Sequence, residues 1–312
     1  METRLGLEWE LWAVAQLAGG ASADAVVATL VGDGLAGDDA RAKVDELLAS
    51  PSFQQLRRDH VRGAMAEQLV RARHDRVERI DRLATIGVDE FHERYWQRSR
   101  PVLLTEAARA MRAVRTWSFG TLAERFGDVE IEINVRRTEA ARSSDTEAHA
   151  RRGTFGEFLR GAATTAGNDT YIVSRNGLLA HPELRPLWDD LAPLPAILAP
   201  PQPPRGASLW IGPAGTRSPA HFDPHGVLLV QVQGEKRVRL VAPDHLDMFE
   251  GLDGYYATRV LDDRALDITI GPGDALFVPL AWFHEVTSLA PSITLSLLCF
   301  PWSNDFHWFE PR

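Results

Sequence analysis

The feature that most constrains the fold is a series of short apolar segments in the C-terminal third of the chain, separated by glycine and proline turns. Two of these turns are Gln233-Gly234-Glu235 and Gly271-Pro272-Gly273-Asp274. No long helical segment intervenes, so the pattern predicts an antiparallel barrel or jelly roll (a double-stranded β-helix). The predicted strands are 208–211, 227–233, 237–241, 266–270, 275–278, 284–288 and 293–300.

The N-terminal part of the chain differs, because its apolar residues recur at helical spacing. This spacing predicts helices over 5–17, 25–30, 40–48 and 53–83, the last of which carries many arginines. We therefore expect residues 1–80 to form a helical domain that serves recognition or dimerisation.

From residue 91 onward the segments become short and mixed. The alternation in 129–135 predicts a half-buried strand, whereas 136–153 is charged, has no apolar period and is predicted to be a loop. Residues 81–312 are expected to form a second, mainly β domain. The predicted class is thus α+β: an antiparallel jelly-roll core with a helical N-terminal domain.

The charge and cysteine content limit the classes of function. The chain has 34 basic and 43 acidic residues and a formal net charge of -9, which disfavours broad binding to nucleic acid. Its single cysteine, Cys299, excludes an intrachain disulfide and a thiolate zinc cluster. We expect a cytoplasmic protein, because neither a membrane span nor a signal peptide is visible.

Three side chains form a candidate metal site. His221 and Asp223 are two residues apart, a spacing that projects both to one side of an extended strand, and His284 lies on a later strand. Two histidines and one carboxylate leave three octahedral positions open, as in non-haem iron(II) oxygenases. A lone histidine is more often structural than metal-binding, so the interpretation depends on this combination.

Lys236 is a candidate cation for binding the distal carboxylate of a dicarboxylic co-substrate. Lys236 opens the strand that we expect to run antiparallel to the strand after the ligand pair, and a partly buried lysine with a hydroxyl neighbour can bind a distal carboxylate. Ser218 and Tyr171 are the predicted hydroxyl partners. His225 has the same strand parity as the ligand pair and is a rival ligand or a residue of the substrate pocket.

Several motifs in order resemble the cupin-like JmjC group, which includes the asparaginyl hydroxylase that inhibits hypoxia-inducible factor. The resemblance extends from about residue 85 to 302. It rests on Phe-His-Glu-Arg-Tyr-Trp at 91–96, Ser-Pro-Ala-His-Phe-Asp at 218–223, Gln-Gly-Glu-Lys-Arg at 233–237, Leu-Val-Ala-Pro-Asp at 240–244, Gly-Pro-Gly-Asp-Ala-Leu-Phe-Val-Pro at 271–279 and Trp-Phe-His at 282–284.

The resemblance implies a 2-oxoglutarate-dependent dioxygenase that hydroxylates a side chain of a peptide or protein. Iron(II) would be held by the catalytic triad His221, Asp223 and His284. The 2-oxoglutarate carboxylate would be bound by Lys236, with Ser218 and Tyr171 beside it. The products would be succinate from 2-oxoglutarate and, with O2 as second co-substrate, the hydroxylated side chain.

The sequence departs from the asparaginyl hydroxylase at two positions and leaves other functions open. Val227, and a residue at about Leu298, stand where that enzyme has asparagines, which removes polar contacts near the co-substrate. A tRNA-base hydroxylase of the same group is one alternative. Another is a metal-binding cupin without oxygenase activity, acting as an isomerase or a sensor, which would not require Lys236. A homodimer is also left open.

Overall fold

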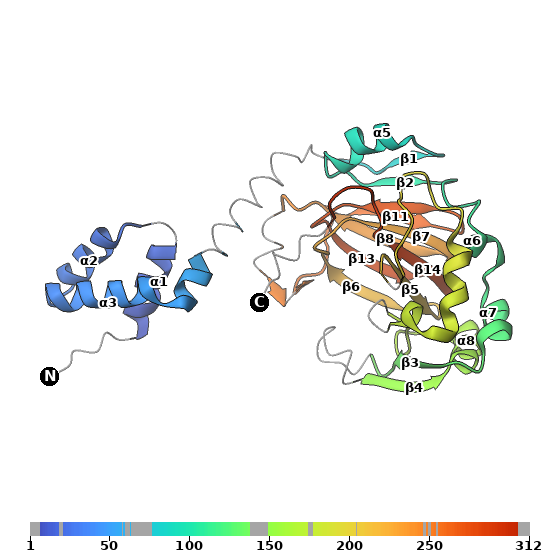
Figure 1. The fold of residues 1–312 in the computed structure, drawn as a ribbon, viewed down its shortest axis with the longest axis horizontal. Helices are drawn as coiled ribbons and strands as arrows, with labels where there is room; N and C mark the ends of the chain where they lie inside the picture. Colours follow the sequence, from blue (N-terminus) through green and yellow to red (C-terminus); the bar gives the residue numbers. More distant parts are fainter. Residues whose placement is uncertain are drawn as a thin grey trace. The chain divides into compact units, whose positions relative to one another are not determined.

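A computed structural model describes residues 7–18, 21–57, 59, 63, 77–137, 149–173, 177–203, 205–245, 248, 251–253 and 255–304 (Figure 1). The chain divides into two compact units, Met1–Ala72 and Arg73–Arg312. This division precedes the predicted boundary between residues 80 and 81.

The N-terminal unit contains helices with a core of their own. They are α1 (Leu7–Ala18), α2 (Ala23–Gly32) and α3 (Gly37–Ala49), followed by helical residues 51–57. Ser22 caps α2 by accepting a hydrogen bond from the backbone N–H of Ala25 at 3.2 Å. The helices bury their apolar faces against one another through Ala13, Leu17, Val26, Leu30, Ala40, Val44 and Phe53.

The predicted helix over 53–83 is wrong at its end. Residues 64–76 lie outside the described residues, and Asp81–Leu83 forms strand β1, which pairs in parallel with β2 (Val102–Leu104). The helical spacing of apolar residues therefore does not continue into a helix here, because residues 81–83 pair with β2 at the edge of a sheet.

Two six-stranded sheets form the larger unit. The major sheet has the order β1-β2-β12-β7-β14-β5, and the minor sheet has the order β11-β8-β13-β6-β10-β9. The remaining strands of the major sheet are β5 (Ala207–Gly212), β7 (Val227–Gln233), β12 (Ala275–Val278) and β14 (Ser292–Leu297). Those of the minor sheet are β6 (Arg217–His221), β8 (Lys236–Val241), β9 (Leu252–Asp253), β10 (Tyr256–Ala257), β11 (Leu266–Ile270) and β13 (Phe283–Ser288).

The chain passes from one sheet to the other between β5 and β8 and again between β11 and β14, whereas β8 to β11 all lie in the minor sheet; two facing sheets connected in this way form a jelly roll. β5, β7, β12 and β14 lie in the major sheet, whereas β6, β8 and β13 lie in the minor sheet. The predicted jelly-roll core with a helical N-terminal region is confirmed. The expected neighbours β7 and β8 do not pair, however: β7 pairs with β12 and β14, and β8 with β11 and β13.

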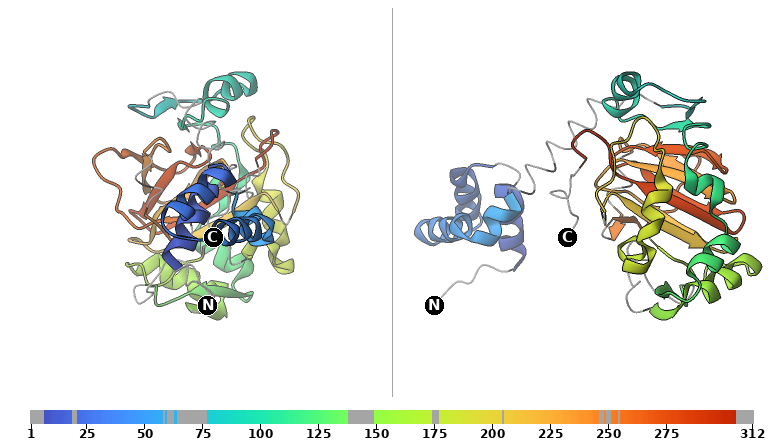
Figure 2. Two further views of the ribbon diagram at one scale, coloured as in Figure 1. Left: turned by 90° about the vertical axis from the view of Figure 1, so that its left-hand side faces the viewer. Right: turned by 45° about the vertical axis from the view of Figure 1, so that its right-hand side comes forward.

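Both faces of the major sheet are covered, as β7 illustrates. Val227 and Leu229 point into an apolar cluster shared with the minor sheet, and Leu228, Val230 and Val232 belong to the cluster on the opposite face. This explains why the strand is apolar at nearly every position. Figure 2 shows helices packed along that outer side.

The helices of the larger unit are short. They are α5 (Val88–Phe91), η1 (His92–Trp96), α6 (Arg112–Thr116), α7 (Phe119–Phe126), α8 (Phe155–Thr164), η4 (Leu178–Ala180) and η5 (Pro182–Leu191). Among the described residues of the chain, no helix is both long and apolar enough to cross a membrane.

The predicted loop over 136–153 is partly a strand. β4 (Ala150–Thr154) pairs antiparallel with β3 (Glu130–Asn134), and residues 138–148 lie outside the described residues. β4 is mostly exposed and carries Arg151 and Arg152, so its sequence has none of the apolar alternation on which the prediction relied.

The turn between the sheets yields a stability prediction. Gly234 has φ +72°, and a Cβ at this position would lie 2.2 Å from the carbonyl oxygen of Pro291. Gly234→Ala should destabilise the unit by about 2 kcal/mol or more, since the left-handed conformation alone costs an L-residue about 1–2 kcal/mol. Gly161→Ala is the control, because nothing lies within 4 Å of its Cβ position and α8 would gain a better helix former.

Thermal unfolding followed by near-ultraviolet circular dichroism measures both variants. We expect the midpoint to fall by several degrees for Gly234→Ala and to hold or rise for Gly161→Ala. Equal midpoints for the two variants would contradict the assigned turn geometry.

Candidate active site

The three predicted metal ligands converge at one end of the minor sheet. His284 on β13 pairs directly with His221 on β6, and their ring centroids are 4.1 Å apart. One potential ligand atom from each of His221, Asp223 and His284 lies within 4.8 Å of the others. β6 ends at His221, so Asp223 is placed by the segment after the strand rather than by the strand itself, contrary to our expectation.

An irregularity in β6 brings Ser218 to the same side as His221. These residues are three apart, so a regular strand would point them to opposite faces. The pairing of β6 with β13 shifts register between the His284–His221 pair and the Val286–Ser218 pair. Such a β-bulge inserts a residue and re-aims the side chains beyond it, and both Ser218 and His221 line the pocket.

Both histidines are oriented by backbone carbonyls. His221 Nδ1 lies 2.7 Å from the oxygen of Pro219, and His284 Nδ1 lies 3.0 Å from that of Trp282. A carbonyl can only accept, so each Nδ1 carries the proton and each Nε2 keeps its lone pair. Metal-binding histidines commonly show this arrangement.

The buried His284 is neutral at physiological pH. Burial of the ring, with a smaller contribution from the neighbouring His221, lowers its pKa to about 4, although the carboxylate of Asp223 opposes both effects. His284 Nε2 lies 3.7 Å from Asp223 Oδ2, a separation that would be an ion pair only with a protonated ring. We therefore interpret the contact as two potential ligand atoms facing a shared point.

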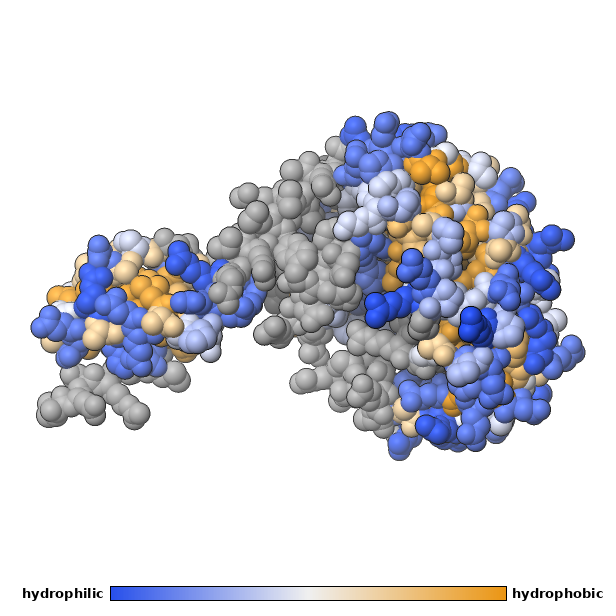
Figure 3. All heavy atoms as spheres, in the orientation of Figure 1, coloured by the Kyte–Doolittle hydropathy of each residue, from blue (hydrophilic) through white to orange (hydrophobic). Residues whose placement is uncertain are grey.

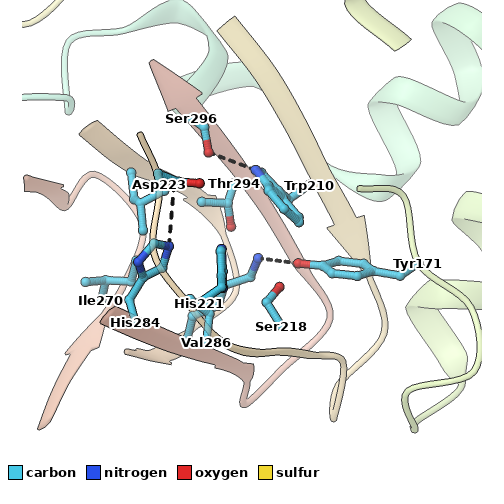
Figure 4. A pocket seen from close by; sticks show the side chains of 12 residues that line it. Tyr171, Trp210, Ser218, His221, Asp223, Ile270, His284, Val286, Thr294 and Ser296 are labelled. Carbon is cyan, nitrogen blue, oxygen red and sulfur yellow. Dashed lines mark hydrogen bonds and ion pairs between the residues drawn. The ribbon is translucent and has the colours of Figure 1, made fainter. Parts of the chain in front are cut away.

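The three candidate ligands line a pocket that the two sheets enclose together with Tyr171, Ser218 and Lys236 (Figure 4). Lys236 opens β8 and is 2% exposed, and its Nζ donates a hydrogen bond to the hydroxyl of Tyr171 at 3.1 Å. Ser218 also lines this pocket. The structure thus brings all six predicted site residues together in one place.

The ammonium group of Lys236 has no counter-charge within the described part of the chain. No carboxylate there forms an ion pair with it, although the residue is buried. An isolated buried charge is unfavourable, so the site is suited to an anion. Lys43 is the only other lysine in the chain, where nearly all cations are arginines.

Close packing against Gly212 fixes the ring of Tyr171. A Cβ at Gly212 would lie 2.6 Å from Tyr171 Cδ2, so only glycine permits this approach. The backbone of Tyr171 also forms an antiparallel bridge with Asn134, at the end of β3. The hydroxyl that faces Lys236 is therefore held by two separate parts of the fold.

The sequence analysis missed several lining residues. Trp210 Nε1 donates to Ser296 Oγ at 2.8 Å, and Thr294 Oγ1 donates to Gln231 Oε1 at 2.8 Å. Thr294 and Ser296 alternate with apolar residues along β14, a signal visible in the sequence. The apolar lining residues are Leu229, Ile270 and Val286.

The two apolar residues that stand where the asparaginyl hydroxylase has asparagines also lie in apolar surroundings. Val227 belongs to the cluster between the sheets, and Leu298 packs against it. His225 lies in the turn between Asp223 and β7, is half-buried, and is not part of the three-residue ligand group.

A distant asparagine holds that same turn. The side-chain oxygen of Asn304 accepts a hydrogen bond from the N–H of Gly226 at 2.8 Å. Its Nδ2 donates to the carbonyl oxygens of Gly226 at 2.9 Å and Leu298 at 3.1 Å. These bonds anchor the segment that carries Asp223.

Two family profiles match the chain. That of the cupin-like domain matches residues 88–252, more than half of the chain, and that of the JmjC domain matches residues 201–305. The second match includes His221, Asp223, Lys236 and His284.

Individual relatives agree with these matches. The chain is 26% identical to Jumonji C domain-containing protein 5 of Drosophila melanogaster over 237 residues, covering 70% of the chain and 59% of that protein. It is 24% identical to lysine-specific demethylase JMJ30 of Arabidopsis thaliana, covering 73% and 55%. It is 30% identical over 202 residues to tRNA wybutosine-synthesizing protein 5 of Danio rerio, covering 56% and 61%.

The chain thus spans somewhat more than half the length of these curated relatives. The jelly-roll fold, the ligand group at its open end and the profile matches agree: the chain belongs to the JmjC, cupin-like family of iron(II)- and 2-oxoglutarate-dependent oxygenases.

Proposed function

We propose that this protein is a 2-oxoglutarate-dependent dioxygenase that hydroxylates a side chain of a peptide or protein. The observation that carries the proposal is the buried Lys236, which lies without an acidic partner among the described residues and in the same pocket as the His221, Asp223 and His284 ligand group. A metal site alone would not require a buried cation beside it.

The residues present fit an iron(II) ion. His221 and His284 each offer an Nε2 lone pair, and Asp223 offers a carboxylate oxygen. Imidazole and carboxylate donors suit iron(II), and three protein ligands leave positions for other molecules. When bound, iron supplies the oxidising chemistry that couples decarboxylation of 2-oxoglutarate to hydroxylation of a C–H bond.

The protein side chains position the co-substrate and keep water away. Lys236 and the hydroxyl of Tyr171 would bind the distal carboxylate of 2-oxoglutarate, and Ser218 lies beside them. Leu229, Ile270 and Val286 line the pocket with apolar surface. Exclusion of water strengthens the pairing of Lys236 with a carboxylate and limits side reactions.

Charge and similarity favour a protein substrate. The net charge of -9 opposes binding to a polyanion, and the Arabidopsis thaliana relative is named a lysine-specific demethylase. The similarity to tRNA wybutosine-synthesizing protein 5 supports a modified tRNA base as the second candidate substrate. A cupin that acts as an isomerase or a sensor is disfavoured, because it has no use for Lys236.

We also propose that the N-terminal unit serves recognition or assembly. It contributes no residue to the ligand group, and it exposes apolar side chains: Leu11 is 61% exposed and Leu56 is 46% exposed. Figure 3 shows apolar atoms among hydrophilic ones on the face of this unit turned to the viewer. Exposed leucines that come together in a contiguous patch would form an interaction site.

The first prediction from the proposed function concerns the metal. His221→Ala and Asp223→Ala should fold but lose iron binding, because each removes one of three ligands. His225→Ala is the matched control and should keep one iron per chain. Titration with iron(II) under anaerobic conditions measures all three, and zinc, nickel or cobalt should occupy the parent site without turnover. Parent-like iron affinity in both ligand variants would remove them from the site.

The second prediction concerns the co-substrate. Lys236→Ala would leave a secluded carboxylate without its cation, at a cost of about 2–5 kcal/mol, or roughly 30-fold or more in affinity. The apparent KM for 2-oxoglutarate should rise accordingly, measured as succinate formed. Lys43→Ala, at the only other lysine, should leave this KM unchanged. An unchanged KM in Lys236→Ala would instead favour the cupin isomerase or sensor.

The third prediction concerns the substrate and the N-terminal unit. Source cells that lack the protein are supplied with the full chain or with residues 73–312, and their proteins and tRNA are compared by mass spectrometry. We expect a peptide to gain one oxygen with the full chain and less with residues 73–312, while the shorter protein still forms succinate. An oxygen gain confined to tRNA would select the alternative substrate. Equal peptide oxidation and equal oligomeric mass would exclude both roles of the N-terminal unit.

A further inference from the structure

Arg137 lies where the end of β3 meets the strand that carries His221. Its guanidinium carbon is 5.0 Å from the centroid of the Tyr171 ring, a cation–π contact. Its Nη2 donates a hydrogen bond to the carbonyl oxygen of Arg217 at 2.8 Å. Arg217 is the exposed first residue of β6 and precedes Ser218, which lines the pocket together with Tyr171, so Arg137 contacts residues that line the pocket or adjoin it without lining the pocket itself.

The charge of Arg137 is not balanced by the described part of the chain. Its Nε is buried without a hydrogen-bond partner, and no carboxylate there pairs with the guanidinium. Burial lowers the pKa of Arg137, against smaller opposing effects of Tyr171 and Tyr256. Other arginines do have carboxylate partners: Arg112 and Arg125 with Asp190, Arg217 with Glu285, Arg237 with Asp267, and Arg264 with Asp262.

Two cations therefore flank Tyr171 without acidic partners among the described residues. Lys236 Nζ is 5.6 Å from the ring centroid and meets the hydroxyl, whereas Arg137 lies over the ring. In the proposed function, one carboxylate of 2-oxoglutarate is directed to the metal and the other to Lys236. Neither carboxylate of 2-oxoglutarate then neutralises the charge of Arg137. That charge is suited to an anion that is not the co-substrate.

We propose that Arg137 is a specificity-determining residue that binds a carboxylate of the substrate, an aspartate or glutamate side chain near the residue that is oxidised. This inference rests on the proposed function. A guanidinium offers a planar pair of donors that matches a carboxylate. Lys236 lines the pocket that would hold the co-substrate, whereas Arg137 does not line it. An anion bound by Arg137 would therefore occupy a different position from the co-substrate.

The test uses the zinc-loaded full chain with 2-oxoglutarate and two isosteric probes, Ac-Gly-Asp-Gly-NH2 and Ac-Gly-Asn-Gly-NH2. Ligand-observed NMR measures their affinities. The parent protein should bind the aspartate probe about tenfold more tightly than the asparagine probe. Arg137→Gln should bind the two probes equally, and the matched control Arg237→Gln, on the outer side of β8, should keep the preference. Equal binding by the parent, or a preference that persists in Arg137→Gln, would overturn the proposal.

Two further measurements separate the explanations. The affinity for 2-oxoglutarate should be the same in Arg137→Gln and parent; a loss as large as that of Lys236→Ala would assign Arg137 to the co-substrate and overturn the proposal. If the parent binds no 2-oxoglutarate, the proposed function fails, whereas the aspartate preference of the zinc-loaded protein still tests Arg137. Should Arg137→Gln not fold, Arg137→Lys replaces it. That variant keeps the charge without the paired donors, and an undiminished preference in it would overturn the proposal.

Discussion

The site depends on the position of β13, which pairs with β6 along one edge and with β8 along the other. This pairing sets His284 opposite His221, and it aligns β8, the strand that begins with Lys236, along the other edge of β13. Because sheet register is discrete, a shift by one residue would turn His284 to the opposite face. The bulge in β6 is part of the same constraint, since it allows Ser218 and His221 to face one pocket.

The charges of the pocket follow from its burial. Lys236 is buried against Tyr171, and Arg137 lies over the same ring. Neither has an acidic partner within the described residues, so both cations favour the binding of anions. The neutral His284 has the opposite role: burial keeps the proton off the nitrogen that a metal would require.

Much of the candidate site could be predicted because its residues carry chemistry at fixed spacing. The sequence predicts His221, Asp223 and His284 as metal ligands and Lys236 with Tyr171 and Ser218 as the co-substrate site, and the structure brings all six together. Strands β7, β11 and β12 have the predicted bounds, since period-two patterning and turn residues mark short strands clearly. Thr294 and Ser296 were not predicted, because an uncharged hydroxyl side chain on a strand does not indicate a particular ligand, whereas a buried lysine indicates an anion.

The sequence by itself determined the class of fold and singled out the candidate metal ligands and the candidate cation for a carboxylate, because these depend on residue type and local spacing. Only the tertiary structure decided which strands are neighbours: β7 and β8 follow each other in the chain yet lie in different sheets. It also decided that Asp81–Leu83 is a strand and that Arg137 meets Tyr171. Such contacts join residues far apart in sequence, and no local pattern encodes a partner that the chain reaches only by folding.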